Sequence, residues 1–194
     1  MVERSLIDSG LILSADLSLS SVLQRIVELA AEITDARYGA LGVIGIDGRL
    51  EEFYTTGVTP EEREAIGDPP VGRGVLGLLM EENRVLRLDD IRSHPRSVGF
   101  PPNHPKMRSF LGASIVARGT VFGDIYLTEK QNAPAFTSDD EEAVKIVAAQ
   151  AGVAIENARL YAEARRDERM LEAFREIALA ILSGAGADAT ESSV

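Results

Sequence analysis

The chain has 194 residues of globular composition, with no apolar run long enough to cross a membrane and no secretory signal, so we expect a cytoplasmic domain with an extension. It contains no cysteine, which excludes disulfides, thiolate-bound metals, iron–sulfur clusters, cysteine nucleophiles and thioether-attached cofactors. Acidic residues outnumber basic ones by 31 to 20 and the net charge is −11, which argues against a nucleic-acid partner because phosphate binding needs a basic face.

A helix and a β-hairpin are expected first along the chain. Residues 20–35 carry apolar residues at helical spacing, which predicts a helix with one buried face. Residues 38–46 and 49–55 have strand composition. Asp47-Gly48 between them is typical of a two-residue type I′ turn.

Two short helices and three more strands are expected next. Thr59 and Glu62 form a capping-box pattern with a proline at the first helical position, which predicts a helix from Pro60 to about Gly67. The pattern then predicts a helix over 74–83, a strand over 85–88, and two strands over 109–118 and 121–130 around Gly119.

From Ser138 to Ser183-Gly184 the pattern is helical, with Ser138 and Glu141 as a second capping box. A helix of about 45 residues is ~65 Å long, more than a domain of this size covers. Apolar residues recur at coiled-coil spacing, which favours a parallel dimer stalk, the alternative being a single helix that folds back along its own domain. The seam residues are Val147, Ala151, Ala154, Ala158 and Tyr161, then Leu171, Phe174, Ala178 and Ile181 in a shifted register.

Both histidines of the chain lie in one proline-rich loop, SHPRSVGFPPNHPKM, at residues 93–107. Histidine is the commonest protein ligand for metals and haem iron. One histidine cannot hold a bare metal ion tightly, but it can supply the single protein bond to a porphyrin iron. His104 lies between prolines that restrict the backbone and beside apolar residues that suit a large flat group. His94 has the setting of an ordinary polar loop residue, and the residues alone leave that interpretation open for His104 too.

Six stretches resemble the GAF domain, and more closely the first, haem-binding GAF domain of the DevS/DosS/DosT family of bacterial oxygen- and redox-sensing histidine kinases. The resemblance covers about residues 15–162, and FPPNHPKMRSFLG is its most specific part. The stretches are ARYGALGV (36–43), LRLDDIRSHP (86–95), VGFPPNHPKMRSFLGA (98–113), VFGDIYLTEK (121–130), FTSDDEEAV (136–144) and GVAIENARLY (152–161).

This resemblance implies an α/β (α+β) GAF fold, with a central antiparallel sheet, helices on its faces and an extended C-terminal helix. Residues 1–14 are then an N-terminal linker or helix, and residues 15–162 the GAF sensor domain. Residues 163–194 are a helical stalk that leads to the next domain and ends in a frayed tail.

The resemblance also implies a haem b site. In that family the histidine of the proline-rich loop is the proximal iron ligand, which falls on His104, and a distal tyrosine that hydrogen-bonds the gas ligand falls on Tyr126. Gly42 matches a position at an access route to the haem edge. Lys106 and Arg108 are candidates by position to hold the haem propionates. The apolar walls are expected from Phe53, Leu76, Leu79, Met107, Phe110 and Leu111.

Strand alternation is consistent with that placement of the tyrosine. Side chains at every second position of a strand share one face. The pocket face of residues 121–130 is then expected to carry Phe122, Asp124, Tyr126 and Thr128.

The function implied is a haem-based sensor of O2, NO or CO, non-catalytic itself, within a two-component sensor histidine kinase. Its partners are the gas ligand, a second copy through the helices and a downstream kinase domain. An alternative is a GAF module without haem, which binds a small ligand such as a cyclic nucleotide or serves as a dimerisation relay. Methionine-sulfoxide reduction and covalent tetrapyrrole attachment, two other GAF functions, need cysteines and are excluded.

Overall fold

The computed structural model describes residues 19–70 and 72–188, apart from the side chains of 181–188. The linker expected over residues 1–14 and the last residues of the tail, 189–194, lie outside the described part. The chain divides into two compact units, one ending at Glu156 and one starting at Asn157. In the described part, no helix combines the length and the apolar character needed to cross a membrane.

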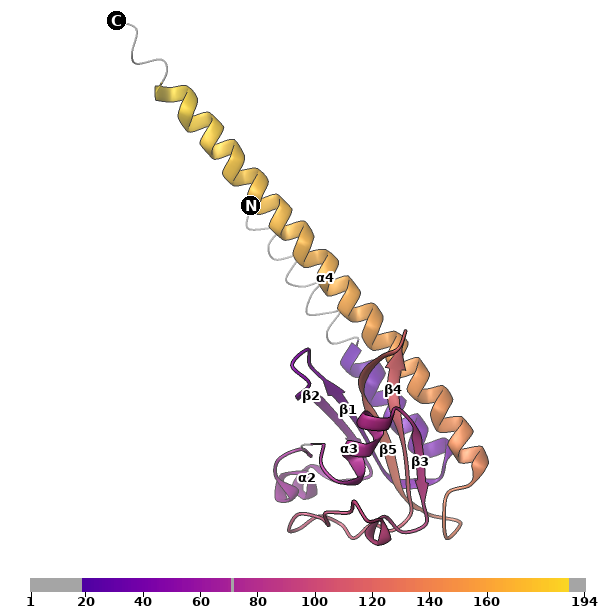
Figure 1. Ribbon diagram of the computed structural model, residues 1–194. Coiled ribbons are helices and arrows are strands. Elements are labelled where there is room, and N and C mark those ends of the chain that lie inside the picture. The colour runs from indigo at the N-terminus through magenta and orange to yellow at the C-terminus, as the bar shows by residue number, and fades with distance from the viewer. Residues whose placement is uncertain (1–18, 71, 189–194) are drawn as a thin grey trace, which may run out of the picture. The chain divides into compact units, whose positions relative to one another are not determined.

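The first unit is built on a five-stranded antiparallel sheet in the order β2-β1-β5-β4-β3 (Figure 1). The predicted antiparallel sheet, the helices on its faces and the long C-terminal helix are confirmed. The strands are β1 (Ala36–Ile44), β2 (Leu50–Thr56), β3 (Val85–Leu88), β4 (Phe110–Ala117) and β5 (Thr120–Lys130). The helices cover residues 19–33, α2 (Pro60–Ile66), α3 (Val75–Glu82), the 3-10 turn η1 (Ile91–Ser93) and α4 (Ser138–Asp188).

The two faces of the sheet carry separate apolar clusters. On one face, the helix over 19–33 and the start of α4 bury the larger cluster, in which Leu23 and Val144 meet Ile125 of the sheet. On the other face, α3 and the segment around η1 form a smaller cluster that contains Val75 and Phe110. This second face is less completely filled, and it carries the hollows described below.

Two of the helices that follow the first hairpin begin at capping boxes. At α2 the Glu62 N–H donates to Thr59 Oγ1 (3.2 Å) and the Thr59 N–H donates to Glu62 Oε2 (2.9 Å), as predicted. At α4 the box lies one residue earlier than predicted. There the Asp140 N–H donates to Thr137 Oγ1 (3.2 Å) and the Thr137 N–H to Asp140 Oδ2 (2.8 Å). The prediction of Ser138 as this cap is therefore wrong.

The β1–β2 and β4–β5 turns both differ from the turns that the sequence predicts. The two-residue turn predicted at Asp47-Gly48 is wrong, because the loop covers residues 45–49 and closes with the Gly45 N–H donating to the Arg49 carbonyl (2.7 Å). A two-residue turn with positive φ at both positions, as type I′ requires, instead joins β4 and β5. Its residues are Arg118 (46°) and Gly119 (81°).

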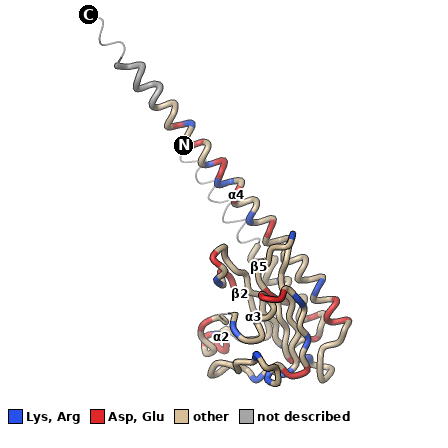
Figure 2. Tube along the Cα trace, in the orientation of Figure 1, with Lys and Arg blue, Asp and Glu red and all other residues tan. Residues whose placement is uncertain are grey.

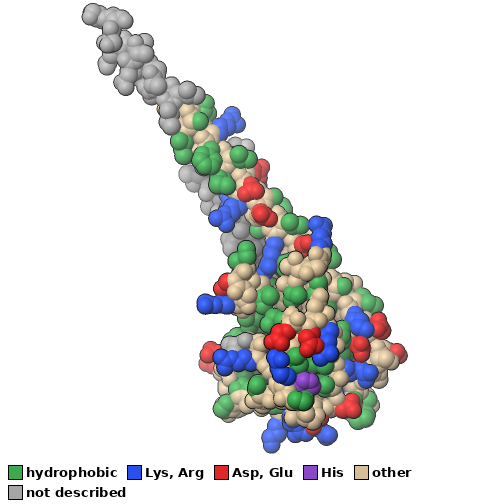
Figure 3. Space-filling model, in the orientation of Figure 1, with side chains coloured by type: hydrophobic (Ala, Val, Ile, Leu, Met, Phe, Trp, Pro, Cys, Tyr) green, Lys and Arg blue, Asp and Glu red, His purple; other side chains and the backbone are tan. Residues whose placement is uncertain are grey.

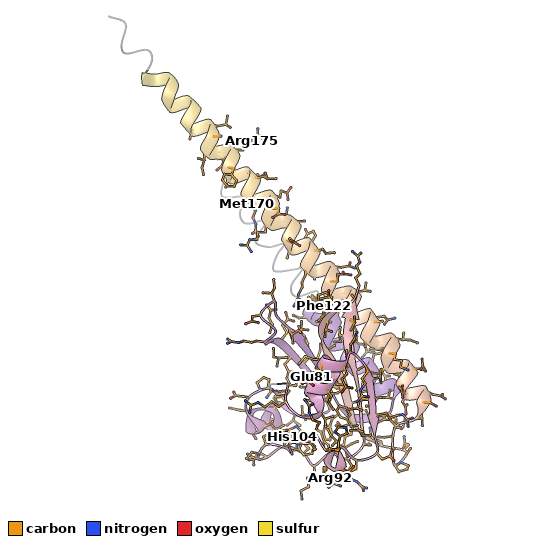
Figure 4. All side chains as sticks on the ribbon, viewed as in Figure 1. Glu81, Arg92, His104, Phe122, Met170 and Arg175 are labelled. Atoms are coloured by element: carbon orange, nitrogen blue, oxygen red, sulfur yellow. The ribbon has the colours of Figure 1, made fainter. Side chains whose placement is uncertain are left out.

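β5 contains a bulge that reverses one side chain. Ile115 of β4 pairs with Gly123 and Val116 with Val121, so Phe122 has no partner in β4. Phe122 therefore packs into the larger cluster, 6% exposed, and the prediction that it shares the pocket face is wrong. Figure 4 shows Phe122 toward the end of the sheet away from the loop that carries His104.

The first two residues of the predicted dimer seam belong to the core of the first unit. Val147 and Ala151 are 4% and 0% exposed within the larger cluster, so they cannot face a second copy, and that part of the prediction is wrong. Their spacing reflects packing of α4 on its own sheet.

The part of α4 in the second unit keeps an exposed apolar stripe. Leu171 and Phe174 are 70% and 63% exposed, and Figure 3 shows hydrophobic side chains at the surface of this stretch. Acidic and basic residues alternate around them along the helix (Figure 2). The helix continues to Asp188, past the end predicted at Ser183-Gly184. This last segment contains two glycines but no proline, so no residue in it removes a helical hydrogen-bond donor.

Candidate functional site

A largely apolar hollow of about 310 Å³ lies on the sheet face opposite the larger cluster. Pockets for small molecules usually hold roughly 300–1,000 Å³, so its size is that of a ligand site. β1, β2 and β5 line it from the sheet, and α2, α3 and the proline-rich loop cover it. It brings together six of the predicted site residues, namely His104, Tyr126, Phe53, Leu76, Met107 and Phe110.

His104 is held in place by the backbone of its own loop. The His104 N–H donates to the Pro101 carbonyl (3.2 Å), which closes a tight turn. Asn103 has a positive φ of 64° in that turn and donates from Nδ2 to the Ala65 carbonyl of α2 (3.1 Å). The imidazole stacks on Phe100 with ring centroids 4.9 Å apart. The half-buried ring is therefore fixed at the wall of the hollow (Figure 4).

One nitrogen of the His104 ring is committed and the other is available. Nδ1 lies 2.8 Å from the Pro105 carbonyl oxygen, which is only an acceptor, so Nδ1 carries the proton and donates. In that tautomer Nε2 keeps its lone pair, and no described residue donates a hydrogen bond to it. A backbone carbonyl that orients Nδ1 is a usual partner of a metal-binding histidine. Nε2 is therefore the ring nitrogen of His104 that is available to a ligand.

His94, in contrast, lies outside the hollow and makes contacts within its own turn. Its N–H donates to the Ile91 carbonyl (3.3 Å), and its Nδ1 accepts from the Arg96 N–H (3.2 Å). These bonds end η1 and shape the following turn. Both agree with the interpretation of His94 as a loop residue.

Tyr126 of β5 presents its ring to the same hollow and stacks on Phe110, with centroids 6.1 Å apart. Burial raises the pKa of Tyr126 well above its ordinary value, and the negative charge of Asp124 raises it further, while Arg63 acts in the opposite sense. The phenol is therefore protonated at neutral pH. Among the described residues its hydroxyl has no hydrogen-bond partner, so it is free to donate to a ligand.

The basic residues of the hollow are not the ones that the sequence suggested. Arg63 of α2 and Arg73, just before α3, line it, whereas Lys106 and Arg108 do not. The Arg63 guanidinium lies 5.4 Å from the Phe53 ring centroid, and Arg108 instead lies 3.7 Å from Asp90. A helix and a strand separate the two arginines from the loop of His104 along the chain, so only folding brings them next to that loop. The sequence signal was limited to α2, whose capping box fixes where Arg63 lies on the helix.

Three other predicted site residues lie outside this hollow. Leu79 and Leu111 are fully buried, Leu79 in the smaller apolar cluster and Leu111 in the larger one. Leu111 follows Phe110 in β4, so strand alternation turns it to the opposite face of the sheet. Gly42 lies beside the hollow, but a Cβ there would stand only 2.9 Å from Leu50 Cδ1 and 3.1 Å from Asp124 Oδ1. The neighbouring side chains therefore already fill the space beside Gly42.

The comparisons with known proteins identify a fold family. A family model for the GAF domain matches residues 16–156. The GAF domain of a phosphoenolpyruvate-protein phosphotransferase from Coxiella burnetii is similar, with a TM-score of 0.60 and 20% identity, over 78% of this chain and 98% of that one. The corresponding GAF domain from Acinetobacter has a TM-score of 0.59 and 21% identity over 73% and 92% of the two chains.

A third similar structure is the type II free methionine-R-sulfoxide reductase from Thermoplasma acidophilum. Its TM-score is 0.60 and its identity 16%, over 74% of this chain and 96% of that chain. At these identities each of the three structures establishes the fold alone.

Proposed function

Since the chain belongs to the GAF domain family, we propose that residues 15–162 form a haem-based gas or redox sensor domain of a cytoplasmic two-component histidine kinase. The observation that carries the proposal is that His104 and Tyr126 line one apolar hollow. His104 offers an available Nε2 there, and Tyr126 an unpaired hydroxyl. The resemblance of the proline-rich loop to the haem-binding GAF domains of sensor kinases supports the same conclusion.

The residues around the hollow fit haem b by their chemistry. His104 would hold the iron through Nε2, the ring nitrogen that no other group uses. Phe53 and Leu76 offer apolar surface for the macrocycle, and the guanidinium groups of Arg63 and Arg73 suit the propionates. When bound, this group supplies an iron centre that takes O2, NO or CO.

Tyr126 would select among these gases by donating a hydrogen bond. Dioxygen gains partial negative charge when it binds to ferrous iron and accepts such a bond better than carbon monoxide does. The raised pKa keeps the Tyr126 phenol protonated, so the donor is present at neutral pH. The largely apolar lining lowers the polarity around that bond, which strengthens it.

The output would pass through α4 to a kinase domain downstream in the full protein. A sensor of this kind needs two states of the protein that bind the gas with different free energies. The exposed Leu171 and Phe174 support a parallel pairing of residues 163–188 with a second copy. The domain itself performs no reaction in this scheme.

The direct test is haem titration of the wild type and of two histidine variants, followed by the Soret band. Wild type and His94→Ala should bind one haem with the same histidine-ligated spectrum, because His94 lies outside the hollow. His104→Ala should lose that spectrum while its far-UV circular dichroism stays unchanged. A histidine-ligated Soret band in His104→Ala, or a colourless wild type after incubation with haem, would contradict the proposal. A colourless protein would favour a GAF module without haem.

A further inference from the structure

A second hollow, of about 540 Å³, lies next to the first. The β1–β2 loop, the segment after α2, helix α3 and strand β5 all contribute to it. Phe53 and Leu76 line both hollows, so they stand between the two. The side chain that β5 contributes to the second hollow is Asp124. Asp124 is not among the residues proposed to contact the haem.

Asp124 is a buried acid whose carboxylate has no partner. Its exposed fraction is 8%, and within the described residues its carboxylate makes no hydrogen bond or ion pair. In the sheet it stands between Gly42 of β1 and Ser114 of β4. Gly42 has no side chain to offer, and the Ser114 hydroxyl donates to the Leu79 carbonyl instead. The carboxylate is thus left to face the hollow.

The charges of the hollow are not balanced by its own residues. Asp68 also lines it, and the basic residue there is Arg49. The Arg49 side chain is 88% exposed and its guanidinium lies 3.7 Å from Asp47 in the loop, so it does not neutralise Asp124. Burial raises the pKa of Asp124 to about 7, and the group is ionised in much of the protein at neutral and higher pH. A buried carboxylate without a partner costs free energy that a bound cation would recover.

We propose that this second hollow binds a small organic cation, an amidinium, guanidinium or primary ammonium group on a compact apolar body, with the cation on Asp124. Planar amidinium and guanidinium groups present two parallel N–H donors that match both oxygens of a carboxylate. Apolar side chains such as Leu50, Leu76 and Met80 would cover the body of the ligand. The charge-bearing residue of this site, Asp124, is not among the proposed haem contacts, although the two hollows share the walls Phe53 and Leu76.

A metal ion fits the same hollow poorly. Among the described residues there is no group of three or more His, Cys, Asp or Glu side chains that could hold one. The hard cations that carboxylates bind take six or more oxygen ligands, many of them water, which the apolar walls disfavour.

Benzamidinium is a suitable probe, and its binding to the full chain can be measured by calorimetry at a pH about one unit above the Asp124 pKa of about 7. We expect saturable binding that is weakened roughly tenfold to a hundredfold in Asp124→Asn, since a hydrogen bond to a charged group is lost while the shape is kept. The exposed acid Glu64 does not line the hollow, so Glu64→Gln should bind as the wild type does. Neutral benzamide and anionic benzoate should not compete.

A second variant tests the hollow without changing Asp124. Met80→Lys places an ammonium group on the wall of the hollow, so it should also abolish benzamidinium binding. Equal affinity for wild type and Asp124→Asn would overturn the proposal, as would a wild-type dissociation constant weaker than about 10 mM.

Discussion

Replacing Asp124 with asparagine should make the protein more stable, and increasingly so as the pH rises. Burial raises the pKa of Asp124 from its ordinary 3.8 to about 7 in the folded protein. The folded state therefore holds this proton more tightly than the unfolded chain does between about pH 4 and pH 7. Across that window the wild type loses stability with rising pH, and above pH 7 the loss is complete.

The size of the effect follows from the shift. About three pKa units at ~1.4 kcal/mol each give a wild-type penalty of about 4 kcal/mol above pH 7, and water entering the hollow beside Asp124 lowers this figure. The asparagine side chain keeps the shape and carries no charge, so Asp124→Asn should unfold with a free energy some ~2–4 kcal/mol higher than the wild type at alkaline pH and nearly equal near pH 4.

Urea denaturation at several pH values between 4 and 8 measures this difference directly. Glu64→Gln is the matched control, because it removes a carboxylate from the surface of the neighbouring helix and should not change the pH dependence. A stability difference between Asp124→Asn and wild type that is the same at all pH values would refute the reasoning, since the ionised carboxylate would then carry no penalty in the folded state.

Two further predictions concern the first hollow. Tyr126→Phe should keep the haem content but weaken O2 binding relative to CO binding by roughly tenfold, because one hydrogen bond to O2 is lost. Flash photolysis measures the ratio of the two affinities, and an unchanged ratio would remove Tyr126 from ligand selection. The double variant Arg63→Leu and Arg73→Leu should transfer haem to an acceptor globin roughly tenfold faster, whereas Arg108→Leu should not, because Arg108 lies outside the hollow. Equal transfer rates would show that the two arginines do not hold the propionates.

Local sequence signals predicted most elements of the fold because each depends on contacts between near neighbours. The Thr59 and Glu62 pair, for example, satisfies the free backbone groups of α2 within one turn, so the pattern is readable without the rest of the chain. The β1–β2 turn was mispredicted although Asp47-Gly48 is a strong turn signal. There a register shift between Val43 and Ile44 lengthens the loop.

Features that depend on distant segments could not be predicted in the same way. Phe122 lies on the core face because a bulge interrupts the alternation of β5, and nothing in the strand's own composition marks the bulge except Gly123. Val147 and Ala151 have coiled-coil spacing, yet the sheet already occupies that face of α4.

The residues of the candidate site show the same contrast between local patterns and contacts between distant segments. His104 and Tyr126 were predicted from a loop and a strand with specific residue patterns, and both line the hollow. Arg63 and Arg73 were missed because they reach it from segments that become its neighbours only in the folded protein. The unpaired state of Asp124 likewise depends on Gly42, which lies opposite it on another strand.

The most direct test of the haem proposal is chemical rescue of the His104 position. His104→Gly should bind haem weakly, without a histidine-ligated Soret band, and added imidazole should restore the band because it fills the space of the missing ring beside Phe100. Imidazole should leave the spectrum of His94→Gly unchanged. A wild-type spectrum in His104→Gly before imidazole is added would contradict His104 as the iron ligand.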